Sequence, residues 1–173
     1  MKKLLSLLLI LASFFSYAQT DSIPIPMKNG IVFYEKYYPM DFRSNKNQQS
    51  VKALQWFGRY FSDVAEALKV ADIKSGKIAG AGAFKVIVGE SGNYFWIQMQ
   101  VAISVTDSGY LFQSYDYYEK PVEKGVSNEY SKIEYRWRDY RQGKPWSPED
   151  QPFFRGIHEN TLAIMASLEK AMH

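Results

Sequence analysis

The segment from Tyr94 to Thr106 constrains the fold more than any other part of the chain. Its side chains alternate without a break, and the apolar set comprises Phe95, Ile97, Met99, Val101, Ile103 and Val105. Alternation with a period of two is typical of a β-strand with one face on a core and the other mostly toward water. We therefore predict a long strand here.

Four further segments have strand patterns and are separated by turn signals. The predicted strands are Ile31–Tyr38, Ala67–Ile73, Ile78–Val88 and Tyr110–Tyr118. The turn residues Ser75-Gly76 join two of them in a hairpin, so the sheet is predicted to be antiparallel. The run Gly80-Ala81-Gly82-Ala83 lacks bulk. It predicts a bulge or a place where a helix lies close on the sheet, because a phosphate loop would need a helix to follow.

Two segments carry apolar residues at helical spacing. The first has Val51, Leu54, Phe57, Phe61 and Val64 in a stripe, with Trp56 and Tyr60 beside it. The second is predicted to start at Ser147 as N-cap, followed by Pro148 and two acidic residues. Its stripe comprises Phe154, Ile157, Thr161, Ile164, Leu168 and Met172. Each stripe predicts an amphipathic helix packed on the sheet.

These elements predict one α+β domain over residues 19–173. We expect a single antiparallel sheet of about five strands, in the order β-α-β-β-β-β-α, with both helices on one face. Residues 119–147 fit no clear element and are predicted to be a poorly defined insertion or loop. Within them Ile133, Tyr135 and Trp137 alternate with charged residues, which indicates a short strand.

Residues 1–18 have the pattern of a secretory signal peptide. Two lysines precede an apolar run from Leu4 to Phe15, and Ser16 and Ala18 form the small pair of a cleavage site. A helix of that run would reach only ~18 Å, which is too short for a ~30 Å bilayer core. The sequence predicts export to the periplasm or the medium, with no membrane span after the signal is removed.

Composition limits the partners and the chemistry. Signal removal takes two of the 21 basic residues and none of the 18 acidic ones, so the mature chain is almost neutral. A near-neutral exported domain has no electrostatic footprint for nucleic acid, and we predict none as a partner. The absence of cysteine excludes disulfides, thiolate nucleophiles and cysteine-based metal sites. With 46% apolar and 16% aromatic residues, the chain can be held by its core.

Three segments in combination resemble a known family of Bacteroidota, the domain of unknown function 4468. They are the first strand at residues 29–36, the helix segment at 54–57 and the hairpin at 72–82. The resemblance extends over roughly residues 29–118. It implies an exported single-domain α+β protein with a TBP-like fold and supplies no catalytic residues. TBP-like describes a shape, which does not bring DNA binding with it.

Aromatic side chains are the feature with functional content. The candidate binding residues are Tyr94, Trp96, Tyr135, Arg136, Trp137 and Trp146. Aromatic platforms with arginines nearby could stack on sugar rings, peptides or lipids. The alternative is that the late segment folds across the sheet and buries these rings as a second small core. The binding hypothesis predicts that Trp96 and Trp137 are accessible to solvent.

No motif predicts catalysis, a cofactor or a metal. His158 is followed by Glu159, but Leu162 stands where a second zinc-binding histidine would be needed. The carboxylate pair Asp116/Glu119 has no sequence-visible cause that would separate the two pKa values, and the pair Glu149/Asp150 is explained by the helix dipole. The predicted function is a non-enzymatic binding or accessory module of the cell envelope, for a small molecule, glycan or envelope protein. A structural or protein-interaction component is the alternative, and a hydrolase without a recognisable motif ranks third.

Overall fold

The computed structural model describes residues 23–40, 45–64, 67–89, 92–122 and 129–173. The predicted signal peptide lies outside the described residues. The elements are β1 (Met27–Lys28), β2 (Ile31–Pro39), α2 (Lys46–Tyr60), β3 (Leu68–Asp72), β4 (Lys77–Ile87), β5 (Tyr94–Val105), β6 (Gly109–Val122), β7 (Ser131–Lys132), α3 (Ile133–Arg141) and α4 (Asp150–Met172). No helix among these residues has the length and apolarity that crossing a membrane requires.

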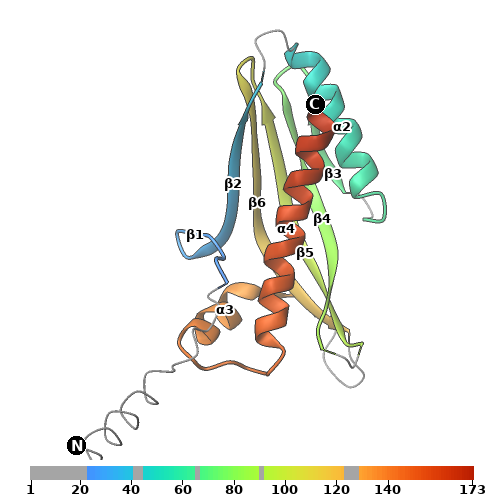
Figure 1. The fold of residues 1–173 in the computed structure, drawn as a ribbon. Helices are drawn as coiled ribbons and strands as arrows, with labels where there is room; N and C mark the ends of the chain where they lie inside the picture. The colour runs from blue at the N-terminus through green and yellow to red at the C-terminus, as the bar shows by residue number, and fades with distance from the viewer. Residues whose placement is uncertain (1–22, 41–44, 65–66, 90–91, 123–128) are drawn as a thin grey trace, which may run out of the picture.

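The sheet is antiparallel, as predicted, but it has more strands than expected. Within the described residues seven strands pair in the order β1-β2-β6-β5-β4-β3, and β7 pairs with β6. The prediction of about five strands missed β1 and β7, which have two residues each. Such short pairings leave no alternation to detect in a sequence. Figure 1 shows α4 running along one face of the sheet, with α2 beside its C-terminal end.

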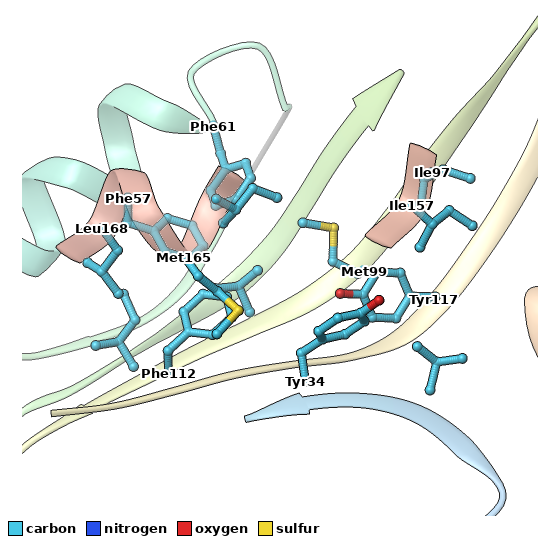
Figure 2. Close-up of a cluster of buried hydrophobic side chains, with 14 of the residues drawn as sticks. Tyr34, Phe57, Phe61, Ile97, Met99, Phe112, Tyr117, Ile157, Met165 and Leu168 are labelled. Carbon is cyan, nitrogen blue, oxygen red and sulfur yellow. The ribbon is translucent and has the colours of Figure 1, made fainter. Parts of the chain in front are cut away.

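The prediction for residues 94–106 is confirmed. Every odd-numbered residue of β5 from Phe95 to Val105 is buried, and the even-numbered ones are exposed or half-buried. The buried side chains meet α2 and α4 in one core, and Figure 2 shows Met99 there with Phe57 and Ile157 from the helices. We call this side of the sheet the inner face and the opposite side the outer face. No described helix covers the outer face.

Strand β6 contains a bulge that the sequence pattern did not predict. Gln98 pairs with Tyr118 but Gln100 pairs with Tyr115, so β6 has one residue more than β5 between these pairs. The bulge lies at Asp116, whose φ is 54°. Before it the even-numbered residues are buried, and after it the odd-numbered Tyr117 and Glu119 are. An extra residue in one strand changes the inward-pointing residues from even-numbered to odd-numbered ones.

Both predicted helices exist, and α4 buries the predicted stripe. Every member of that stripe, from Phe154 to Met172, is buried. In α2 the buried set is instead Gln49, Ser50, Ala53, Trp56 and Phe57, while Val51 is exposed. Trp56 lies against α4 and its Nε1 donates to Ser167 Oγ at 3.1 Å. A wide apolar arc predicts a helix but leaves open which part of the arc is buried.

The late segment contains a third helix where a short strand was predicted. Ile133 and Trp137 are buried in α3, one helical turn apart, while Tyr135 points to solvent. The alternation of apolar and charged residues was therefore wrong as a strand signal, because burial follows the spacing of four. Helix α4 also begins three residues after the predicted N-cap. Ser147 lies in the preceding turn and accepts a bond from Glu149 N at 3.2 Å.

Close packing explains the small residues of β4. A Cβ on Gly80 would lie 1.9 Å from the carbonyl oxygen of Ala67, and one on Gly82 would lie 2.7 Å from the Phe61 ring. Residues at the end of α2 therefore lie directly on β4, and β3 has a bulge between Leu68 and Val70 opposite Gly80. The close approach of a helix end to this run is confirmed, whereas the bulge lies in β3 opposite Gly80 and not in the run itself.

Two alanine substitutions at glycine are expected to have opposite effects on stability. Gly80→Ala should lower the free energy of unfolding by about 1–3 kcal/mol, because the clash is with backbone that must move. Gly58→Ala should raise it by up to about 1 kcal/mol, because alanine is the better helix former. A Cβ at Gly58 would meet nothing within 4 Å. Urea denaturation measures both, and effects of the same sign would contradict the packing described here.

Candidate functional site

The structure separates the six predicted binding residues into two groups. Tyr94 and Trp96 lie on the outer face of β5, with ring centroids 6.1 Å apart. Tyr135, Arg136 and Trp137 belong to α3, and Trp146 lies in the turn before α4. Phe95, which is the buried neighbour of Trp96, lies between the two groups. The six residues therefore do not form one surface.

Trp137 belongs to the core. It is 5% exposed, and its ring centroid lies 4.8 Å from Phe154 and 5.7 Å from Tyr140. The expectation that Trp137 is accessible to solvent is wrong, because α3 turns this ring toward α4. Tyr135 on the opposite side of α3 is 63% exposed. The alternative is right that this ring is buried, but Trp137 belongs to the single core under α4 and not to a second core across the outer face.

Arg136 is the centre of a buried ionic network. Its Nη1 lies 2.7 Å from Glu119 Oε2, and its Nε and Nη2 each lie 2.7 Å from Asp150 Oδ1. All three side chains are buried, and the guanidinium lies 4.5 Å from the Phe153 ring centroid. The network joins β6, α3 and the first residue of α4. It is a structural connection, not an open binding site.

Burial raises the pKa of Glu119 above its usual range, while the neighbouring guanidinium acts in the opposite direction. Asp150 Oδ2 also accepts a bond from Trp146 N at 2.6 Å, which fixes the turn before α4. Trp146 itself is 55% exposed and its Nε1 donates to Asp139 at 2.8 Å. Of the α3 group, only Tyr135 and Trp146 present their rings to solvent.

A groove brings together outer-face side chains of the sheet and the end of α2, which the sequence did not connect. We call it the aromatic groove. Its volume is about 390 Å³, and it is lined by Tyr60, Phe61, Asp63, Val64, Ala83, Trp96, Gln98, Lys120 and Tyr130. Among these, only Trp96 was predicted as a binding residue. The other residues come from the end of α2 and the turn after it, from β4, β5 and β6, and from the segment before β7.

Three rings at the groove remain accessible to a ligand. Tyr60 is 41%, Trp96 is 40% and Tyr130 is 47% exposed. Lys120 lies opposite Trp96 in the β5–β6 register, and its Nζ is 5.5 Å from the Tyr130 ring centroid. Gln98 and Asp63 add an amide and a carboxylate. Rings with a few polar groups among them are the usual composition of a ligand-binding groove.

The groove depends on two local features of the fold. Phe61 caps the C-terminal end of α2 and is 2% exposed, so it anchors this end on Gly82 of β4. The β5–β6 register, with Asp116 as an extra residue of β6, places Lys120 on the outer face, next to Trp96. The groove could not be predicted from the sequence, because the position of Lys120 next to Trp96 depends on the β5–β6 register. The alternation of β5 alone placed Trp96 and Gln98 correctly on the outer face.

A second groove lies beside α4 and contains His158. Its volume is about 450 Å³, and Tyr34, Leu162 and Met165 are among its lining residues. His158 Nδ1 and Tyr34 Oη are 3.1 Å apart, so the histidine is partly buried against β2 instead of lying on a fully solvated helix face. No group of three or more potential metal ligands occurs in the described part of the chain.

The fold defines the class of protein. An antiparallel sheet with its long helices packed on one face is a two-layer α+β domain. No family model matches the chain, and no curated protein matches it in sequence.

Two solved structures share this fold. One is a DUF4468 family protein from Bacteroides ovatus, with a TM-score of 0.70 and 14% identity, over 86% of this chain and 90% of that chain. The other is a TBP-like protein from Parabacteroides distasonis, with a TM-score of 0.72 and 14% identity, over 86% of this chain and 96% of that one. The predicted resemblance to DUF4468 is confirmed in the fold. Similarity of fold at this level of sequence identity does not identify a ligand or an activity.

Proposed function

We propose that this protein is an exported, non-enzymatic binding module and that its ligand occupies the aromatic groove. The observation that carries the proposal is the convergence of Tyr60, Trp96 and Tyr130 on one groove, each with about two fifths of its surface exposed or more. Exposed tyrosine and tryptophan rings supply much contact area at a small entropic cost, and they dominate binding energies. A signal peptide at residues 1–18 would deliver the module to the envelope.

The acidic residues favour binding over catalysis. Glu119 and Asp150 converge, as a hydrolase would need, but both are buried and both are paired with Arg136. Neither lines the aromatic groove or the groove at His158. A carboxylate that cannot reach a substrate cannot act as its acid or base.

Tryptophan fluorescence tests the proposal directly. In the variant Trp146→Phe, Trp96 is the only well-exposed tryptophan, because Trp56 and Trp137 are 4% and 5% exposed. We expect iodide to quench a large part of the emission in this variant and little after Trp96→Phe is added. Fractions of an envelope extract that contain the ligand should protect Trp96 from iodide in a saturable way.

Two tyrosine variants locate the site. Tyr130→Ala removes a ring of the groove and should weaken the protection of Trp96 by about tenfold, which corresponds to ~1.4 kcal/mol. Tyr135→Ala removes a ring on α3 that is even more exposed but lies outside the groove, and it should change nothing. The proposal fails if no fraction protects Trp96, or if Tyr135→Ala weakens the protection and Tyr130→Ala does not.

A further inference from the structure

Strand β4 extends well beyond its neighbour β3. The β3–β4 pairing ends at Leu68 and Gly80, and one more bond joins Ala81 N to Ala67 O at 2.7 Å. Beyond it, no described strand pairs with this side of β4 over residues 83–87, although β5 pairs with the other side to the end. Figure 1 shows β4 continuing past the end of β3.

The direction of the backbone groups in this stretch follows from two bonds. Ala81 N donates toward the β3 side, and Val88 N donates to Asn93 O on the β5 side. Backbone groups of successive residues in a strand point to alternate sides. The N–H and C=O groups of Ala83, Lys85 and Ile87 therefore point to the free edge, where no described residue pairs with them.

This edge has little of the usual protection against pairing with another chain. Edge strands are commonly blocked by proline, by bulges, by charged side chains such as lysine or by inward-pointing charge. Residues 83–87 of β4 contain no proline, and the β4–β5 register has no irregularity. Ile87 is 63% exposed at the edge. The one charged residue is Lys85, whose Nζ lies 3.7 Å from the Tyr94 ring centroid.

The free edge is continuous with the aromatic groove. Ala83 belongs to both, and Lys85 pairs with Trp96 in the β4–β5 register. A strand added along residues 83–87 would carry alternate side chains on the outer face, and one of them would reach the groove between Trp96 and the end of α2. Main-chain bonds would give affinity and the groove would give specificity.

We propose that the ligand is an extended segment of a partner protein, which adds to the sheet as a strand along Ala83–Ile87. This inference rests on the proposed function and names its ligand class. The segment carries an apolar or aromatic side chain for the groove and an acidic side chain for Lys85, which has no carboxylate partner among the described residues. A second copy of this chain fits less well, since self-pairing centred at this position would bring two Lys85 side chains together.

The test uses mature protein, residues 19–173, and random dodecapeptides displayed on phage, followed by synthetic peptides of the enriched sequences. Enriched peptides should combine an apolar or aromatic residue with an acidic one. In hydrogen exchange, the amides of Ala83, Lys85 and Ile87 should exchange fast in the free protein and become protected by the peptide. The amides of Phe84 and Val86 are bonded to β5 and should be slow in both states.

Two substitutions of Lys85 separate the contribution of its backbone N–H to binding from that of its side chain. Lys85→Pro removes an N–H that faces solvent, which an edge strand tolerates, and its ring blocks an incoming strand. It should weaken peptide binding by at least about tenfold, while Lys85→Ala, which keeps the N–H, should weaken it by about threefold at most. Circular dichroism and the slow amides of β4 confirm that Lys85→Pro is folded.

The outcomes separate this inference from the proposed function. Peptides that protect Trp96 from iodide but leave the amides of Ala83, Lys85 and Ile87 unprotected overturn strand addition and leave the groove as the site. Concentration-dependent protection of these amides without peptide, with a dimer in sedimentation, overturns it in favour of self-pairing. If no peptide is enriched, the proposal of strand addition fails. The proposed binding function fails as well only if no envelope fraction protects Trp96 from iodide.

Discussion

Replacement of Arg136 by methionine is expected to lower the free energy of unfolding by about 3–5 kcal/mol, among the largest effects of any single substitution in this chain. Methionine has a similar length, so the loss is not mainly one of volume. The guanidinium is 7% exposed and contacts Glu119 and Asp150, which are 4% and 0% exposed. Without it, two carboxylates remain in the core with no counter-ion.

A matched control and a double variant isolate the electrostatic part. Arg138→Met removes an exposed arginine two positions along the same helix and should change stability by less than about 0.5 kcal/mol. Glu119→Gln combined with Arg136→Met should be more stable than Arg136→Met alone, because one stranded charge is removed. Denaturant unfolding of the unmodified protein, Arg136→Met, Glu119→Gln and the double variant measures this coupling. A double variant less stable than Arg136→Met would contradict the network.

The loss of stability in Arg136→Met should also depend on pH, and the pKa of Glu119 determines the direction of this dependence. Burial raises the pKa of this carboxyl in the folded protein. A group with a raised folded pKa binds more protons in the folded than in the unfolded state, so its contribution to stability falls as pH rises through that pKa. Without Arg136 the pKa rises further. Arg136→Met should therefore be more destabilising at pH 8 than at pH 5, relative to the unmodified protein.

The elements that could be predicted from the sequence are those in which buried residues recur at one regular spacing. The β5 alternation and the α4 stripe both run for several turns or pairs, and the structure confirms each residue of them. The hairpin at Ser75-Gly76 is also confirmed, and Gly76 has the positive φ of 77° that such turns need. These features are local, so one stretch of chain contains all the information about them.

The features that sequence reasoning missed depend on residues far apart in the chain. In α3, Ile133, Tyr135 and Trp137 alternate like a strand, and only packing on Phe154 decides that Trp137 is buried. The partners of Arg136 lie 17 and 14 positions away, on β6 and α4. The aromatic groove needs the end of α2, the β5–β6 register and Tyr130 at once. Periodicity in one segment carries no signal for such arrangements.

The Asp116 bulge has the widest consequences of these long-range features, and the largest loss of stability is expected at the residue that follows it. Tyr117 is fully buried and bonded to Ser114 and Thr161. In urea denaturation, Tyr117→Ala should lower the free energy of unfolding by about 3–5 kcal/mol, because it removes a large aromatic side chain from the core. Deleting Asp116 instead restores a regular register between β5 and β6, in which Tyr117 still points inward and Lys120 still points outward. We expect the deletion variant to fold, with near-ultraviolet circular dichroism close to that of the unmodified protein.

The substitution Asp116→Gly is the matched control, because it keeps the extra residue and changes only the side chain. Glycine adopts a φ of 54° without strain, and the ion pair to Lys132, at 4.0 Å and exposed, contributes little. Its stability should change by less than about 1 kcal/mol, and its near-ultraviolet spectrum should be unchanged. The bulge accommodates Asp116 as an extra residue of β6, so Glu119 stays turned inward to Arg136 and Lys120 outward to Trp96. A deletion variant that is unfolded, or in which ligand no longer protects Trp96, would contradict this account of the register.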